Sequence, residues 1–237
     1  MANIVSIILP TYNEVDNIVP LVHAILEWIP EGYTPELFVV DDNSPDGTYA
    51  RALQQFAEEP RVRCLLRTHD RGFAASIRHG IESATGEWVI VMDTDLTHDP
   101  AEIPNLLHLA QKYDVIIGSR FCAGGDMPSL KRYLASMVYN WGVRLIVQSQ
   151  IQDNLSGFFC TRRQILMELD RNAIFQGYGE YFIRLLYYIQ KRKHSILEMP
   201  VVYRNRIYGK SKSNFFKMAV TYGYAAFMVR FRHRPRH

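Results

Sequence analysis

Five short runs of branched aliphatic residues, separated by segments with helical periodicity, constrain the fold of this chain more than any other feature. The apolar runs occupy residues 4–9, 37–40, 62–66, 88–92 and 114–120, and the helical segments lie at about 15–29, 47–58, 71–84 and 101–112. Near-continuous apolar strands that alternate with helices are typical of a parallel sheet covered on both faces. The pattern therefore predicts an α/β, Rossmann-like fold with a mostly parallel central sheet and helices on both faces.

The 237 residues suffice for one well-buried domain, and no long Gly/Ser/Pro linker or repeat divides them. The three cysteines are odd in number and widely spaced, which favours thiols in a reducing compartment over a disulfide framework. No basic segment followed by an apolar core precedes the first predicted strand. We therefore expect no signal peptide and a cytoplasmic location.

Polar residues gather where the predicted strands end. They are Tyr12 and Glu14 after the first strand, Asp41 and Asp42 after the second, Asp93 and Asp95 after the fourth, and Arg120 at the end of the fifth. In parallel α/β sheets, ligands bind in the crevice beyond the carboxyl ends of the strands. The sequence therefore predicts one ligand site that collects residues from several strands.

Asp93 and Asp95 form an Asp-x-Asp pair directly after an apolar run. At the end of a strand, two carboxylates with this spacing converge on the same cleft. Mg²⁺ and Mn²⁺ prefer oxygen ligands and commonly combine one or two carboxylates with substrate phosphates. The pair therefore favours a metal and diphosphate site of a nucleotide-dependent transferase, with a plain solvated turn as the alternative.

Several motifs, taken together, resemble glycosyltransferase family 2. They are Pro10-Thr11-Tyr12-Asn13-Glu14, Asp41-Asp42-x-Ser44-x-Asp46-Gly47-Thr48, Asp93-x-Asp95-Leu96-x-His98-x-Pro100 and Gly118-Ser119-Arg120. Ser156-Gly157-Phe158 and Arg206-x-Tyr208-Gly209-x-Ser211-Lys212 extend the resemblance to the dolichol-phosphate mannose synthase and polyprenyl-phosphate glycosyltransferase group. The resemblance covers about residues 4–214 and implies a GT-A catalytic domain at 1–213, followed by a basic, apolar tail at 214–237.

The resemblance implies a nucleotide-sugar site in which Tyr12 offers a face to the base and Glu14 accepts hydrogen bonds from base or ribose. The implied set is Pro10, Tyr12, Glu14, Val39, Asp41, Asp93, Thr94, Asp95, Arg206 and Lys212. Taken singly, Glu14 is also explained as an acid at a helix start, and Asp46-Gly47 as a turn. The prediction of a nucleotide-sugar site therefore rests on all the motifs together and not on any single residue.

The resemblance also implies a Mg²⁺ or Mn²⁺ ion that stabilises the leaving diphosphate. Asp95 is the predicted direct ligand and Thr97 lies near the ion, whereas Asp93 contacts the ribose or reaches the metal through water. The family usually has Ala at position 94 and Gln or Ser at position 97, where this chain has Thr. The hydroxyl of Thr97 still supplies an oxygen.

The chemistry of the acceptor decides which further groups are needed. A phosphate acceptor is already an anion near neutral pH, so the protein must supply cations rather than a base. The predicted catalytic set is Asp95, Arg120, Arg206 and Lys212, and the predicted acceptor-phosphate set is Arg120, Lys131, Arg132 and Ser156.

A sugar hydroxyl acceptor would instead require a general base, for which Asp153 and Glu180 are the candidates. For either acceptor, the resemblance implies that the basic segment 206–212 folds over the donor phosphates, and a solvated basic loop is the alternative.

The C-terminal segment is strongly basic. Residues 204–237 carry nine Lys or Arg and no acid, whereas residues 1–203 carry 18 basic and 24 acidic residues. Because residues 215–229 are apolar and aromatic, an anionic membrane is a better partner than nucleic acid. Fifteen residues are too few to span a bilayer, which needs about 20, so we expect an interfacial helix, with packing on its own domain as the alternative.

A second apolar helical face lies at 129–149. From the sequence, this face could pack in the core or contact a membrane. A separate membrane-anchoring subunit also stays open as a partner.

These features predict a metal-dependent, inverting hexosyltransferase that is peripheral to the cytoplasmic face of a membrane. Its predicted substrates are a nucleotide sugar, with GDP-mannose preferred over UDP-glucose, and dolichyl or polyprenyl phosphate. The alternatives are a family 2 transferase that acts on a sugar hydroxyl and a non-enzymatic, basic lipid-binding module.

Overall fold

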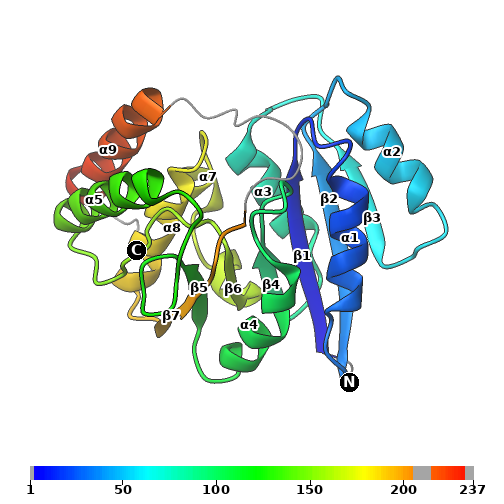
Figure 1. Cartoon of the computed structure of the whole chain (residues 1–237), viewed down its shortest axis with the longest axis horizontal. Helices are drawn as coiled ribbons and strands as arrows, with labels where there is room; N and C mark the ends of the chain where they lie inside the picture. Colours follow the sequence, from blue (N-terminus) through cyan, green and yellow to red (C-terminus); the bar gives the residue numbers. More distant parts are fainter. Residues whose placement is uncertain (1–2, 205–214, 233–237) are drawn as a thin grey trace.

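A computed structural model describes residues 3–204 and 215–232, with the backbone alone at 215–217. Its centre is a seven-stranded sheet (Figure 1). The strands are β1 (Asn3–Thr11), β2 (Tyr33–Asp41), β3 (Val62–Leu66), β4 (Trp88–Val91), β5 (Val115–Ser119), β6 (Phe159–Arg162) and β7 (Ile196–Pro200). They lie side by side in the order β3-β2-β1-β4-β6-β5-β7.

The sheet is mostly parallel, as predicted. Only β6 runs antiparallel to its neighbours, β4 and β5, among the strand pairs of the described residues. The five predicted strands correspond to β1 to β5, whereas β6 and β7 have no counterpart among the predicted strands.

Helices cover both faces of the sheet. They are α1 (Ile18–Glu27), α2 (Thr48–Gln55), α3 (Phe73–Ser83), a short 3-10 turn (Pro100–Glu102), α4 (Ile103–Ala110), α5 (Leu130–Val147), α6 (Arg163–Met167), α7 (Arg171–Ile174), α8 (Tyr181–Lys191) and α9 (Phe215–Phe231). One core joins α1, α2 and α4 to one face, and a second core joins α3, α6, α7 and α8 to the other. The strands β1, β4 and β5 carry apolar side chains at most positions and are buried on both sides, except at the first two residues of β1.

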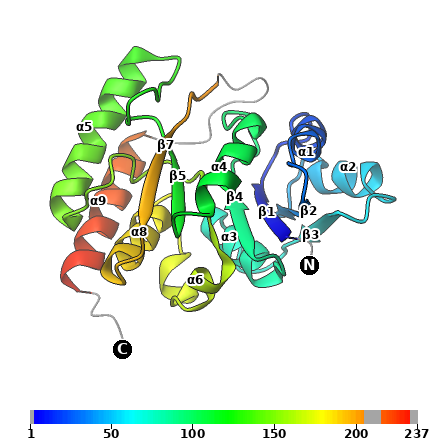
Figure 2. The same cartoon turned by 90° about the horizontal axis from the view of Figure 1, so that it is seen from below.

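The helices α5 and α9 lie side by side next to α8 (Figures 1 and 2). A third core, which includes Val143, Ile183, Tyr222 and Ala226, holds them together. The apolar face predicted within 129–149 is not core. Tyr133 is half-buried, and the other residues of that face, Leu130, Leu134, Met137, Val138, Trp141 and Leu145, are exposed. None of the helices in the described part of the chain is long and apolar enough for a membrane span.

The chain order reverses between β1 and β4. From β1 the chain moves outward to β2 and β3, and then returns to place β4 on the other side of β1. Such a switch point opens a crevice at the carboxyl ends of the two strands. Residues 10–14 span the end of β1 and the start of the loop after it, and residues 93–95 follow β4, so the topology brings the two segments together.

Candidate active site

The end of β1 and the loop that follows β4 meet at the switch point. Thr94 donates from Oγ1 to the backbone carbonyl of Pro10, 3.2 Å away. A cavity of about 350 Å³ opens between the loops. This first cavity is lined by Pro10, Thr11, Tyr12, Asn13, Glu14, Asp42, Phe73, Ser76, Asp93, Thr94, Asp95 and Tyr178.

Local contacts hold the Asp93–Asp95 loop in one shape. Thr97 donates to Asp95 Oδ1 from its backbone N–H, at 3.1 Å, and from its hydroxyl, at 2.6 Å. The backbone N–H of Asp93 donates to His98 Nδ1 at 2.9 Å. Leu96 takes a φ of 62°, a left-handed conformation that few non-glycine residues adopt. The loop geometry therefore depends on the contacts made by the residues around Leu96.

His98 connects this loop to the segment that precedes β6. Because Nδ1 accepts from Asp93, Nε2 carries the proton and donates to the Tyr203 hydroxyl, 2.9 Å away. That hydroxyl donates onward to the Ser156 carbonyl at 3.0 Å. Burial lowers the pKa of His98 to about 4, so the ring is neutral near pH 7 and braces the loop without adding charge.

The carboxylates suit a divalent ion that is shared with a substrate. Asp93 and Asp95 line the same cavity, and the Thr97 hydroxyl lies against Asp95. Among the residues that the structure describes, no group of three or more His, Cys, Asp or Glu side chains is placed to hold a metal. Mg²⁺ and Mn²⁺ complete such partial sites with phosphate and water oxygens, so the donor set fits these ions.

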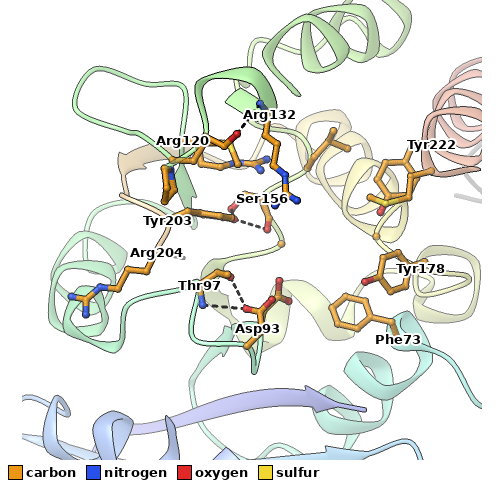
Figure 3. Close-up of a pocket in the computed structure, with 18 of the residues that line it drawn as sticks. Phe73, Asp93, Thr97, Arg120, Arg132, Ser156, Tyr178, Tyr203, Arg204 and Tyr222 are labelled. Atoms are coloured by element: carbon orange, nitrogen blue, oxygen red, sulfur yellow. Dashed lines mark hydrogen bonds between the residues drawn. The ribbon is translucent and has the colours of Figure 1, made fainter. Parts of the chain in front are cut away.

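A second cavity, of about 650 Å³, lies beyond the two carboxylates (Figure 3). It shares Phe73, Asp93, Asp95 and Tyr178 with the first cavity. Its further lining includes Thr97, Arg120, Met127, Ser129, Arg132, Leu155, Ser156, Gly157, Tyr181, Tyr203, Arg204, Met218 and Tyr222. Asp93 and Asp95 carry the only carboxylates in the described lining.

Arg120 enters the second cavity from the end of β5 as half of a buried ion pair. Its Nε and Nη2 each donate to Asp153 at 2.8 Å, and its backbone N–H donates at 3.1 Å. Asp153 is fully buried. Burial acts to lower the pKa of Arg120, but the Asp153 charge outweighs it and raises that pKa above its usual range. Because both oxygens of Asp153 are bound to Arg120, this carboxylate is not available as a general base.

A groove of about 540 Å³ runs from Arg120 between α5 and α9. Lys131 and Arg132 lie on its wall, with Ala135, Ser136, Tyr139, Leu155, Met218, Ala219 and Tyr222 along the rest. Tyr139 of α5 donates to the Ala219 carbonyl of α9 at 2.6 Å, which ties the two walls together. The groove thus combines cations with an apolar lining, a combination that suits an anionic amphiphile.

A family model described as Glycosyl transferase family 2 matches residues 6–170. The chain belongs to glycosyl transferase family 2. This confirms the family resemblance.

Relatives with curated names agree with the narrower resemblance. The chain is 33% identical to a dolichol-phosphate mannosyltransferase of Pyrococcus furiosus over 214 residues, which are 88% of this chain and 58% of the relative. It is 31% identical to an undecaprenyl-phosphate mannosyltransferase of Micrococcus luteus, over 86% of this chain and 85% of the relative. The chain thus spans less than two thirds of the Pyrococcus furiosus protein.

A solved structure supports the predicted fold. Glucosyl-3-phosphoglycerate synthase from Mycobacterium tuberculosis, in complex with Mn²⁺, uridine diphosphate and glucosyl-3-phosphoglycerate, matches with a TM-score of 0.74 at 18% identity. The match covers 95% of this chain and 79% of that one. The fold is therefore the GT-A-like α/β fold expected from the sequence.

Most of the predicted site residues line these cavities. The first cavity alone is lined by Pro10, Tyr12, Glu14 and Thr94, and the second alone by Thr97 and Ser156, while Asp93 and Asp95 line both. Arg120 and Arg132 line the second cavity and the groove, and Lys131 lines the groove. Val39 and Asp41 are fully buried and line none of the three. Both Asp41 oxygens accept hydrogen bonds from Ser44. Arg206 and Lys212 lie outside the described residues, and all these functional roles stay predictions.

Sequence reasoning missed the aromatic lining. Phe73 begins α3, Tyr178 lies in the loop before α8, and Tyr222 faces the cavities from α9. Phe73 follows the third strand, so the rule that ligands bind beyond strand ends signalled its position. Tyr178 and Tyr222 have no such signal, because each reaches the site through the packing of distant segments.

Proposed function

We propose that this chain transfers a hexose from a nucleotide sugar, with GDP-mannose as the preferred donor, to dolichyl or polyprenyl phosphate. The observation that carries the proposal is the continuous lining from the first cavity, past Asp93 and Asp95, into a cationic and apolar groove. The activities for which the two mannosyltransferase relatives are named support the donor sugar and the lipid class.

The reaction joins an acceptor phosphate oxygen to the anomeric carbon as the bond from that carbon to the donor diphosphate breaks. Attack from the face opposite the leaving group inverts the configuration. The acceptor phosphate is already ionised and needs no base. This agrees with the structure of Asp153, because both oxygens of its carboxylate accept hydrogen bonds from Arg120. Arg120, Lys131 and Arg132 would bind the acceptor phosphate and offset its repulsion from the donor.

A bound Mg²⁺ or Mn²⁺ would act as a Lewis acid on the leaving diphosphate. Asp95, with Thr97 beside it, is the proposed ligand, and Asp93 would contact the ribose or metal-bound water. Pro10, Tyr12 and Glu14 would bind the nucleoside in the first cavity. Arg206 and Lys212 are proposed to bind the donor phosphates on the basis of the sequence motif alone.

We also propose that α5 and α9 contact the cytoplasmic face of a membrane. Val138, Trp141 and Phe227 are more than half exposed, and α5 and α9 flank the groove. Exposed apolar side chains beside a basic groove favour an anionic lipid surface, because both hydrophobic and electrostatic attraction contribute.

The decisive experiment incubates the protein with GDP-mannose, UDP-glucose and other nucleotide sugars, each with Mn²⁺ and one of two acceptors. One acceptor is a polyprenyl phosphate, and the other is a free sugar that offers only hydroxyls. Transfer to the polyprenyl phosphate supports the proposal, and the donor used identifies the sugar. Transfer only to the sugar hydroxyl would refute it.

Asp95→Ala tests the metal assignment. We expect this variant to keep the fold and to lose Mn²⁺-stimulated transfer, whereas Glu58→Ala, which removes an exposed carboxylate of the loop after α2, keeps it. Near-normal Mn²⁺-stimulated activity in Asp95→Ala would refute the assignment.

Trp141→Ser tests the membrane contact, with Trp28→Ser as its matched control. Trp28 is 46% exposed at the end of α1 and Trp141 is 60% exposed on α5. We expect Trp141→Ser to pellet less with anionic vesicles at high salt, where apolar contact dominates, and Trp28→Ser to pellet as the wild type does. Equal pelleting of both variants would place the membrane contact elsewhere.

A further inference from the structure

The first and second cavities meet at four residues, Phe73, Asp93, Asp95 and Tyr178. If the nucleotide occupies the first cavity and the acceptor phosphate approaches through the second, the bond that breaks lies at their junction. The hexose being transferred must therefore lie against these four side chains.

The junction has two walls of opposite chemistry. Asp93 and Asp95 form an acidic wall, while Phe73 and Tyr178 form an aromatic wall with ring centroids 5.1 Å apart and a 46° angle between the rings. Figure 3 shows Phe73 and Tyr178 together, with Arg120 on the other side of the cavity. Tyr178 is 44% exposed, so its ring is accessible to a ligand.

The aromatic wall is held by one backbone hydrogen bond between two distant segments and by one local hydrogen bond to a side chain. The Ala74 N–H donates to the Gly177 carbonyl at 3.4 Å, which fixes the start of α3 against the loop before α8. The Tyr178 N–H donates to Glu180 at 3.0 Å. Behind the wall, the buried Tyr181 ring lies 6.2 Å from the Phe73 ring. The wall is therefore part of the packed structure and is in place before a ligand arrives.

A hexose matches this pair of walls. A pyranose ring presents C–H groups on its faces and hydroxyls around its edge, so an aromatic surface can pack on a face while carboxylates accept hydrogen bonds from the edge. We propose that Phe73 and Tyr178 form the hexose subsite of the donor and that the rings act on the sugar rather than on the nucleotide. This inference rests on the proposed transfer from a nucleotide sugar.

Calorimetric titration in the presence of Mn²⁺ and without acceptor separates the sugar from the nucleotide. Wild type, Phe73→Ala and Tyr178→Ala are each titrated with GDP and UDP and with the corresponding nucleotide sugars, GDP-mannose and UDP-glucose. For the nucleotide sugar that wild type binds, we expect each variant to bind about ten-fold more weakly, with an unchanged affinity for the free diphosphate. Tyr178→Phe, which keeps the ring, should restore the affinity for the nucleotide sugar.

Tyr12→Ala is the matched control, because Tyr12 lines the first cavity but not the second. This variant should lose affinity for the free diphosphate and the nucleotide sugar by the same factor. Because Tyr178 is partly exposed, its alanine variant tests the subsite even if Phe73→Ala does not fold.

An equal loss of both ligands in Tyr178→Ala, or no loss of either, would overturn the subsite. If wild type binds no nucleotide sugar, the proposed function and the subsite fail together. If it binds one but transfers no sugar to a polyprenyl phosphate, only the proposed acceptor fails.

Discussion

Replacing Asp153 with Asn should destabilise the protein strongly, because it removes the charge partner of a buried cation. Asp153 is fully buried, Arg120 is 8% exposed, and three N–H groups of Arg120 donate to the carboxylate. Asn has nearly the same shape, but it carries no charge, and its side-chain NH₂ group would face an N–H donor of Arg120 where the carboxylate has an acceptor oxygen. Arg120 cannot lose its proton in response, because its pKa lies above the range of ordinary solution conditions.

The expected magnitude follows from the burial of the pair. Breaking a buried ion pair by removing one partner costs about 3–5 kcal/mol. Arg120 lines the second cavity and the groove, so water reaches part of its guanidinium, and we expect the lower value of about 3 kcal/mol. At about 2–4 °C per kcal/mol for a domain of this size, the melting temperature should fall by about 6–12 °C.

Thermal and urea unfolding of Asp153→Asn measure this change, with Glu87→Gln as the control. Glu87 pairs with Arg162 on the surface, where the two side chains are 52% and 40% exposed. Surface pairs contribute about 0–1 kcal/mol, so the control should unfold within a few degrees of the wild type. If Asp153→Asn also unfolds at the wild-type temperature, the Asp153 charge does not compensate Arg120 and the reasoning about this pair is wrong.

Three further predictions concern pH, the His98 contact and the basic segment. Burial lowers the pKa of His98 to about 4, whereas the unfolded chain takes up this proton near pH 6.5. The free energy of unfolding should therefore keep the whole contribution of neutral His98 above pH 6.5, and should fall by up to about 3 kcal/mol on acidification to pH 4. Urea titrations at several pH values between 4 and 6.5 should show that the free energy of unfolding depends less on pH in His98→Asn than in the wild type. The same pH dependence in both proteins would contradict the lowered pKa of His98. Tyr203→Phe removes the hydroxyl between His98 and Ser156 and should lower the free energy of unfolding, measured with urea, by about 1–3 kcal/mol. An unfolding midpoint equal to that of the wild type would contradict this prediction. Arg206→Ala and Lys212→Ala should lower turnover more than nucleotide affinity, measured by steady-state rates beside calorimetry; normal maximal rates with lost binding would make the segment a binding element only.

Local patterns in the sequence were enough to predict the first half of the fold. Every residue of the runs at 4–9 and 37–40 except Ile4 is buried, and all but Ser6 are apolar, so the runs are easy to recognise. The predicted helix at 15–29 begins later, at Ile18, after a left-handed Asn13 with a φ of 55° and a turn at 15–17 in which the Glu14 carbonyl accepts from the N–H groups of Asn17 and Ile18. Helix boundaries of this kind depend on loop contacts that periodicity does not record.

The second half of the sheet was less predictable. The strand β6 has only four residues, Phe159–Arg162, and pairs antiparallel with two strands that are distant in the sequence. Nothing local in so short a segment specifies its partners. The Arg120–Asp153 pair was missed for the same reason, because the two residues lie 33 positions apart and meet only through tertiary packing.

From the charges of the second cavity, we propose that the reaction needs both a metal and the basic segment 206–212. Of the three arginines in its described lining, Arg120 is paired with Asp153 and Arg204 with Asp99, which leaves Arg132 as a cation without a carboxylate partner in that part of the chain. The acceptor phosphate would bring a charge of about −1.5 to −2, and each donor phosphate would add to it. The acidic wall of Asp93 and Asp95 lies at the junction, between the proposed donor and acceptor sites. A divalent ion at that wall and cations from the segment 206–212 would therefore be required to balance the bound phosphates, so loss of either should be more damaging than loss of Lys131 at the groove.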